Sequence, residues 1–187
     1  MRARFIPALL LAASLLAGCG VQRKAASSSI AEVHVAFAAI TEQAENLMPD
    51  EARSLHDGLA QARDDFEHGN YSAVLIATKS LRNRVRDMED RLPEKRTELE
   101  STWARFEASL PHTLEKLDRN YAPSARPTGG SRRANFDECR HELQGVEALW
   151  EDAQSAQRLG RLADAVSKAG DARYRALKLL DVAETGS

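Results

Sequence analysis

The sequence predicts an all-α protein, an antiparallel bundle of five to six amphipathic helices. Three observations predict this fold. From Ser29 onward, apolar residues recur every three or four positions, which is the spacing of one face of an α-helix. Strand-like alternation of apolar and polar residues is absent from the same stretch. Hydrophobic residues make up 43% of the 187 positions but aromatic residues only 5%, which indicates a core of leucine, alanine and valine.

The first residues have the features of a secretory signal peptide. Arg2 and Arg4 supply a basic start, and residues 5–17 form an apolar stretch that is shorter than the roughly 20 residues of a membrane-spanning helix. The stretch ends in Leu-Ala-Gly-Cys at residues 16–19, which resembles the lipobox of bacterial lipoproteins. The resemblance implies that residues 1–18 are removed as a signal peptide and that Cys19 becomes the acylated first residue. An ordinary signal peptide, or a chance match ahead of a cytosolic domain, is the alternative.

The lipobox resemblance also implies a location. Acylated Cys19 would contact membrane lipid and hold the protein in the cell envelope, on the periplasmic side. Gly20 occupies the position where inner-membrane retention usually shows aspartate, so the outer membrane is favoured over the inner. Residues 20–28, GVQRKAASS, are predicted as a polar linker, a flexible coil that spans roughly 15 to 20 Å.

The helical domain is predicted over residues 29–187. An apolar stripe over residues 30–47 predicts the first helix, and Pro49 with its acidic neighbours predicts either a kink or a tight reversal before the second. Gly69 and Asn70 are typical of the end of a helix. The third helix follows with the clearest stripe in the chain: Val74, Thr78, Leu81, Val85, Met88 and Leu92.

Proline and glycine divide the second half of the domain. Pro93 with Glu94 predicts the start of a fourth helix, and Pro111 is expected to kink or break that helix. Residues 121–133 carry no apolar period and are predicted as a long loop. Two more helices follow, over residues 136–159 and 162–183, joined at Gly160. The segments around Gly69 and Gly160 resemble the inter-helix turn of tetratricopeptide hairpins, although the 34-residue repeat is absent.

Three residues with possible chemistry lie on predicted apolar stripes. Cys139 has no disulfide partner if Cys19 is acylated, and it lies on the stripe of the fifth helix, so we expect a buried structural thiol. Trp103 and Trp150 are expected to pack in the core rather than to stack on a ligand.

The remaining candidate sites are weak. Phosphate-binding loops, nucleophile elbows and the HExxH and CxxCH motifs are absent, so no enzymatic activity, catalytic residue or cofactor is predicted. Asp65 with His68, and Glu138 with His141, have the carboxylate-histidine spacing of ferritin-like di-metal bundles. We interpret them as surface histidines and predict no metal ligand. Three arginines of the predicted loop are interpreted as solvated residues rather than lipid contacts: Arg126, Arg132 and Arg133.

Charge excludes one class of partner. The net charge is -2, and removal of the two signal-peptide arginines, Arg2 and Arg4, makes it about -4 over 169 residues. Nucleic acid is therefore not an expected partner.

A further set of residues lies between position 103 and the end of the chain: Trp103, Pro111, Phe136, Trp150, Ala153, Gly160, Asp164, Ala165, Val166 and Ala169. In these residues the chain resembles a family of small helical envelope proteins of Proteobacteria that has no assigned activity. The resemblance implies an envelope location and a helical fold.

Together, these features predict a noncatalytic binding or scaffolding domain with an envelope protein as partner. A bundle that holds a metal ion or a small apolar ligand between its helices is the alternative, and a purely structural role is a third possibility.

Overall fold

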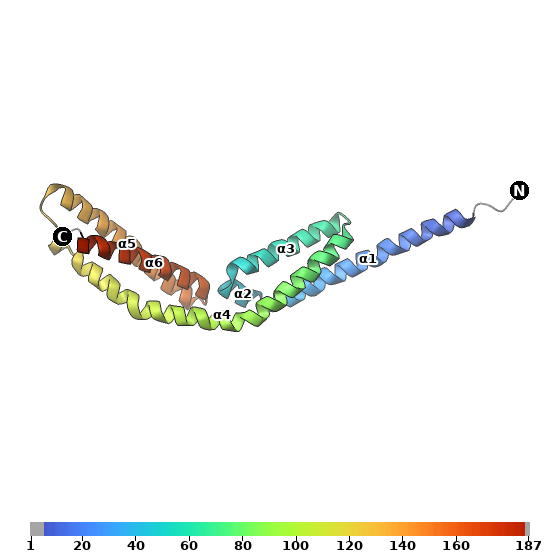
Figure 1. Ribbon diagram of the computed structural model, residues 1–187, viewed down its shortest axis with the longest axis horizontal. Coiled ribbons are helices and arrows are strands. Elements are labelled where there is room, and N and C mark those ends of the chain that lie inside the picture. Colours follow the sequence, from blue (N-terminus) through green and yellow to red (C-terminus); the bar gives the residue numbers. More distant parts are fainter. Residues whose placement is uncertain (1–5, 186–187) are drawn as a thin grey trace. The chain divides into compact units, whose positions relative to one another are not determined.

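The computed structural model describes residues 6–185, and the side chains of residues 20–130 and 132–185. Over that part the chain forms six α-helices and one short 3-10 helix, without a strand, which confirms the predicted all-α class (Figure 1). In chain order the elements are α1 (Ile6–Ala38), α2 (Thr41–Leu47), α3 (Pro49–Glu67), α4 (Tyr71–Asn120), η1 (Pro123–Ala125), α5 (Gly130–Arg158) and α6 (Leu162–Thr185).

The helices form two compact units, within the stretch that the sequence assigns to one helical domain. Unit 1 is Met1–Leu92 and contains α1, α2, α3 and the first part of α4. Unit 2 is Pro93–Ser187 and contains the rest of α4, α5 and α6. At 1.5 Å per residue the 50-residue α4 is about 75 Å long, whereas α5 has 29 residues and α6 has 24. Shorter helices can cover only one part of it, so each part has its own core.

Unit 1 packs α1, α2, α3 and the start of α4 around small and branched side chains. Pro49 takes the first position of α3, where a missing N–H costs nothing, and the chain reverses there, so that α3 runs back beside α1 (Figure 1). Of the kink and the reversal that the sequence allows, the structure contains the reversal. The core consists of Ala26, Val33, Phe37, Ile40, Ala44, Leu47, Met48, Ala52, Leu55, Leu59, Ala62, Val74, Thr78, Leu81, Val85, Met88 and Leu92.

The prediction of a flexible coil over residues 20–28 is wrong, because these residues belong to α1. The apolar stripe of α1 begins earlier than Ile30: Ala26 is fully buried, one helical repeat of seven residues before Val33. Ala26 lies on the same apolar stripe as Val33 and Phe37, and its burial stabilises the helix through a segment whose composition alone suggests a linker.

The predicted boundary between a third and a fourth helix at Pro93 is also wrong, because α4 continues from Tyr71 to Asn120 through Pro93 and Pro111. Each proline removes one helical hydrogen bond, to the carbonyl four residues earlier, at Glu89 and Glu107. Both prolines and both glutamates are exposed, so water can reach the freed carbonyl oxygens. An exposed proline therefore weakens α4 without ending it.

Unit 2 has a core of two stacked tryptophans and a row of alanines. The rings of Trp103 on α4 and Trp150 on α5 lie 5.3 Å apart between centroids at an angle of 19°, which confirms the prediction that both are core residues. The small side chains of α6 let it approach α5 closely, as their spacing predicts. These fully buried alanines are Ala165, Ala169, Ala172 and Ala176.

The two glycine turns have the same backbone geometry. Gly69, between α3 and α4, has φ +79°, and Gly160, between α5 and α6, has φ +76°. In each turn the glycine N–H donates to the carbonyl three residues earlier, at 3.1 Å for Gly69 and 2.9 Å for Gly160. The N–H of the residue after the glycine donates to the carbonyl five residues before that residue, at 2.8 Å in the first turn and 3.0 Å in the second. This is the Schellman pattern, which satisfies the last carbonyls of a helix and requires a left-handed residue. The predicted similarity of the two turns is confirmed.

We expect Gly160→Ala and Gly170→Ala to change the stability of unit 2 in opposite directions. A Cβ at Gly160 meets no steric clash, but the left-handed backbone costs about 1 to 2 kcal/mol. At Gly170, inside α6, a Cβ lies at an ordinary 3.9 Å from Phe106 Cζ, so alanine gains about 0.4 to 1 kcal/mol. Denaturant unfolding followed by the two tryptophans, both in unit 2, measures each change. If both variants changed the free energy of unfolding in the same direction, the result would contradict the turn geometry.

Candidate functional site

The candidate site is a surface groove between α1 and α3 in unit 1, made of two adjoining hollows. The first, called here the anchor-side hollow, has a volume of about 580 Å³. The second, called the apolar hollow, has a volume of about 400 Å³. Ser27 and Phe66 line both. The anchor-side hollow is lined by Gly20, Arg23, Lys24, Ser27, Ser28 and Phe66, and the apolar hollow by Ser27, Ile30, Ala31, His34, Val35, Arg63, Phe66 and Glu67.

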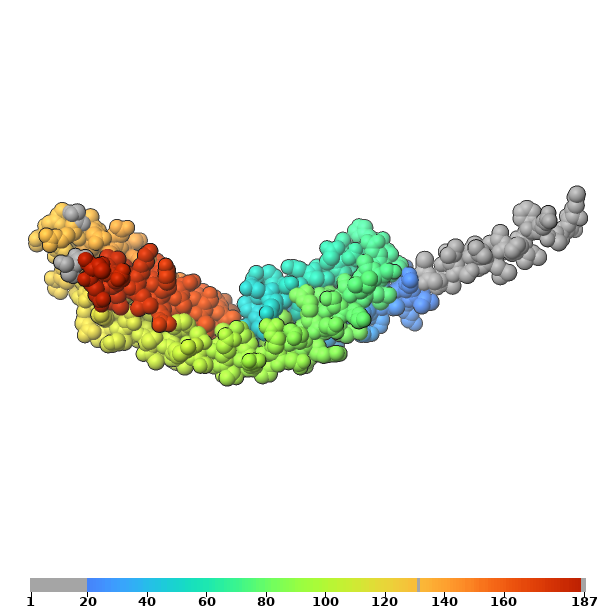
Figure 2. Space-filling view, viewed as in Figure 1, coloured from blue at the N-terminus to red at the C-terminus, as the bar shows by residue number. Residues whose placement is uncertain are grey.

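Helical spacing places the α1 residues of the groove on one side of that helix. Gly20, Lys24, Ser27 and Ala31 follow each other at intervals of three or four residues, so they share a face. In Figure 2 the described part of α1, in blue, lies beside the end of α3 and the start of α4. Phe66 lines both hollows of the groove, and its ring makes an edge-to-face contact with Tyr71, with ring centroids 5.4 Å apart.

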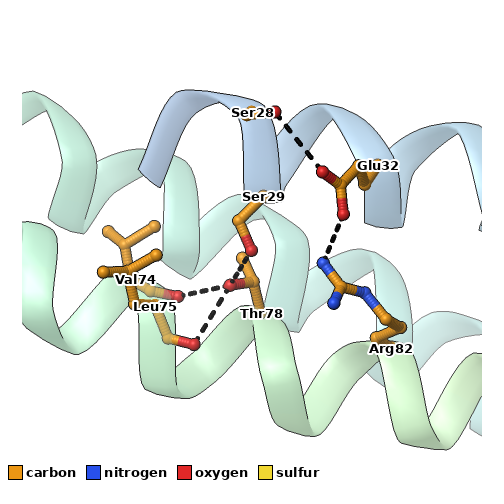
Figure 3. Close-up of polar contacts among 7 residues, drawn as sticks. All are labelled: Ser28, Ser29, Glu32, Val74, Leu75, Thr78 and Arg82. Carbon is orange, nitrogen blue, oxygen red and sulfur yellow. Dashed lines mark hydrogen bonds and ion pairs between the residues drawn. The ribbon is translucent and has the colours of Figure 1, made fainter. Parts of the chain in front are cut away.

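Contacts between α1 and α4 hold α1 in this position (Figure 3). Thr78 is fully buried, and its hydroxyl donates to the Val74 carbonyl at 2.8 Å. Ser29 Oγ and Thr78 Oγ1 share a 2.6 Å hydrogen bond, in which Ser29 is the donor when the Thr78 proton lies on the Val74 carbonyl. One turn further, Arg82 pairs with Glu32 at 2.6 Å. A neutral, partly buried bond and a surface ion pair therefore set the register of α1 on α4.

The cations of the groove have no partner among the described side chains. Arg23, Lys24 and Arg63 make no ion pair or side-chain hydrogen bond with any residue whose side chain is described. Elsewhere in the unit, Arg53, Arg82, Arg84 and Arg91 each contact a carboxylate or a serine hydroxyl, whereas Lys79 and Arg86 on α4 share the unpaired state of the groove cations. The groove thus presents three cations that the described part of the fold leaves available.

Acidic groups at the end of α3 are mostly satisfied within their own turn. Asp64 lies 3.6 Å from His68 Nδ1, and Asp65 accepts a hydrogen bond from the Asn70 amide at 3.1 Å. The hydrogen bond to the Asp64 carbonyl, together with the Asp64 carboxylate, raises the pKa of His68. Glu67 is the carboxylate that lines the apolar hollow.

Cys19, the predicted acylation site, lies on the backbone of α1, one residue before the groove begins. Its side chain, with those of the predicted signal peptide, lies outside the described residues. The structure therefore places the backbone of Cys19 without testing its modification.

The two carboxylate-histidine pairs lie in different units of the chain. Asp65 and His68 belong to unit 1, whereas Glu138 and His141 belong to unit 2. His68 contacts Asp64 rather than Asp65. Across the described residues, no group of three or more histidine, cysteine, aspartate or glutamate side chains is arranged to hold a metal ion.

Cys139 is buried, as its stripe predicts, and carries a free thiol. It packs near Tyr121, whose hydroxyl donates to the Leu179 carbonyl at 3.3 Å. Burial raises the pKa of Tyr121 well above its usual range, and the neighbouring Cys139 thiol adds to the shift. A hollow of about 280 Å³ beside Cys139 is lined by charged residues of α5 and α6, among them Glu142 and Arg175, which pair at 2.6 Å.

The loop before α5 is shorter than predicted. It covers residues 121–129, with η1 inside it, so Arg132 and Arg133 are in the first turns of α5 rather than in the loop. Arg126 pairs with Asp137 and lowers the pKa of that carboxyl. At the start of the loop, the Arg140 guanidinium donates a hydrogen bond to the backbone carbonyl of Tyr121 at 3.3 Å.

Compared with known proteins, the chain matches no family model, no curated protein and no solved structure. Over the described residues, none of the helices combines the length and the apolar character needed to cross a membrane.

The groove is the feature that sequence reasoning missed. Its signal was present in part: Ala26, Val33 and Phe37 extend the apolar stripe of the first helix back into the predicted linker. The contribution of α3 could not be read in this way, because Phe66 and Arg63 meet α1 only through the reversal at Pro49.

Proposed function

We propose that this chain is a bacterial lipoprotein, cut before Cys19 and acylated there, which holds a noncatalytic binding or scaffolding domain on the periplasmic side of the cell envelope. The observation that carries the proposal is the lipobox-like Leu-Ala-Gly-Cys at residues 16–19, within a helix whose later residues pack in the core of unit 1. Several acyl chains on Cys19 hold a protein far more firmly than one chain does. Gly20 favours the outer membrane as the location.

The helical start of α1 supports a fixed, short connection between lipid and domain. Ala26 is seven residues after Cys19, so about 10 Å of helix separates the acylated position from the core of unit 1. A flexible linker would let the domain sample many orientations. A helical connection instead holds unit 1 at the bilayer surface.

A partner surface is proposed on α6 in unit 2. Tyr174 and Leu177 are separated by one turn and leave 69% and 48% of their surface exposed. Arg173 and Lys178, also exposed, flank them. Two apolar side chains between two cations suit a helical or extended protein segment with apolar and acidic residues. Partly exposed aromatic residues commonly anchor such contacts.

We expect a photo-crosslinking amino acid at position 174 to capture one specific protein in intact cells. Ala108 on α4, which is exposed and also in unit 2, provides the control position. Leu177→Glu should reduce the capture at least about tenfold, because a buried unpaired charge costs more than about 1.4 kcal/mol at an interface. Capture that is equal at positions 174 and 108, or unchanged by Leu177→Glu, would remove α6 as the partner surface.

A further inference from the structure

We propose that the anchor-side hollow binds the headgroup of an anionic phospholipid and so orients unit 1 on the bilayer. The inference rests on the proposed function, since acylation of Cys19 is what brings the hollow to a membrane. It goes beyond that function because it assigns a second, noncovalent lipid contact to named residues.

Position is the first argument. Arg23 and Lys24 follow Cys19 by four and five residues, which places them about 6 to 7.5 Å along the helix axis from the acylated position. That distance is shorter than the Debye length of about 8 Å at physiological ionic strength. Their charges would therefore act directly on the lipid phosphates of the leaflet that holds the acyl chains.

Charge is the second argument. Arg23 and Lys24 have no carboxylate partner among the described side chains, as shown above, so they can bind an external anion without breaking an ion pair. Arg63 adds a third cation in the adjoining hollow. Among the acidic residues at the end of α3, Glu67 alone lines the groove, whereas Asp64 contacts His68 and Asp65 accepts a hydrogen bond from Asn70.

The shape and lining of the hollow fit a headgroup better than an acidic protein segment. The Ser27 hydroxyl can donate to a phosphate oxygen, whereas the Ser28 hydroxyl donates to Glu32 at 3.3 Å, and the Phe66 ring provides an apolar wall beside the glycerol region. Val21, in the same stretch of α1, exposes 70% of its surface and can enter the interfacial region of the bilayer. Each cation near an anionic leaflet adds about 1 kcal/mol of attraction, and burial of the exposed apolar residue in the interface adds to it.

Hydrogen–deuterium exchange of the acylated protein in vesicles tests this proposal. We expect the amides of residues 20–31 and 63–70 to exchange at least about fivefold more slowly on phosphatidylcholine vesicles that contain phosphatidylglycerol than on phosphatidylcholine alone. High salt should remove the difference. The double variant Arg23→Gln with Lys24→Gln should lose it, because glutamine keeps the helix propensity and removes both charges.

The control variant is Lys79→Gln with Arg86→Gln. Both residues are exposed on α4 in unit 1 and are away from the groove, and the change in net charge is the same. This variant should keep the dependence on anionic lipid. Equal exchange on the two kinds of vesicle, or an equal loss in both double variants, would overturn the headgroup site.

Failure of the two proposals can be distinguished. The mass of the peptide that contains Cys19 reports acylation independently of any exchange measurement. Acylated protein without lipid-dependent protection overturns the headgroup site and leaves the proposed function intact. Protection of the same amides by polyglutamate, but not by anionic vesicles, would assign the hollow to an acidic protein segment and also overturn the lipid site.

Discussion

Replacing Cys19 with alanine is expected to abolish acylation and to release the protein from the membrane fraction. Each buried methylene of an acyl chain contributes about 0.8 kcal/mol, and a single myristoyl chain gives an association constant on the order of 10⁴ M⁻¹. Loss of several chains should therefore lower membrane partitioning at least about 10⁴-fold. Intact-protein mass spectrometry measures the acyl mass, and an alkaline wash of membranes measures the release.

Cys139→Ala is the matched control, because it removes the other cysteine of the chain. Its thiol is buried in unit 2 and cannot accept a lipid without unfolding, so both the acyl mass and the membrane fraction should stay at wild-type values. Two results would reject the lipoprotein proposal: wild-type protein without acyl mass on its Cys19 peptide, or unchanged membrane association in Cys19→Ala.

Trp150→Ala is expected to cause the largest loss of stability in unit 2, about 3 to 5 kcal/mol in the free energy of unfolding. The ring is 7% exposed and stacks on Trp103, and its removal leaves a cavity in a core to which α6 contributes mainly alanines. Alanines on α6 cannot fill that cavity by changing rotamer. Fluorescence of Trp103, the remaining tryptophan, follows the transition during denaturant unfolding.

Tyr174→Ala provides the comparison for this loss. It also removes an aromatic side chain from a helix of unit 2, but that side chain is 69% exposed. The change should stay within about 0.5 kcal/mol, the usual range for surface positions. A loss below about 1 kcal/mol for Trp150→Ala, or similar losses for both variants, would contradict the stacked tryptophan core.

Apolar spacing predicted the buried faces of the helices well, because burial in a helical fold follows the 3.6-residue period. Every position of the stripe from Val74 to Leu92 is buried, including Thr78, and so is the stripe that carries Cys139 and Trp150. The turns at Gly69 and Gly160 could be predicted for a similar reason, since a left-handed position that ends a helix favours glycine.

Element boundaries at proline and in polar segments were less predictable. A proline ends a helix or remains inside it according to whether its freed carbonyl can reach water, and exposure at Pro93 depends on how α4 packs. Residues 20–28 were predicted as coil from composition, yet burial of Ala26 and the bond from Ser29 to Thr78 stabilise them as helix. Both outcomes depend on contacts with other elements.

The sequence by itself determined that the chain is all-helical, which faces of its helices are buried, where two of its turns lie, and that Cys19 is the candidate for acylation. Only the tertiary structure decided that α4 is one helix shared by two units, and that the cations of α1 meet Phe66 across a groove. The physical reason is the range of the interactions. Helical periodicity is local and visible in a few residues, whereas a groove needs side chains that are about 40 positions apart in the chain, such as Arg23 and Phe66, to be brought together by a chain reversal.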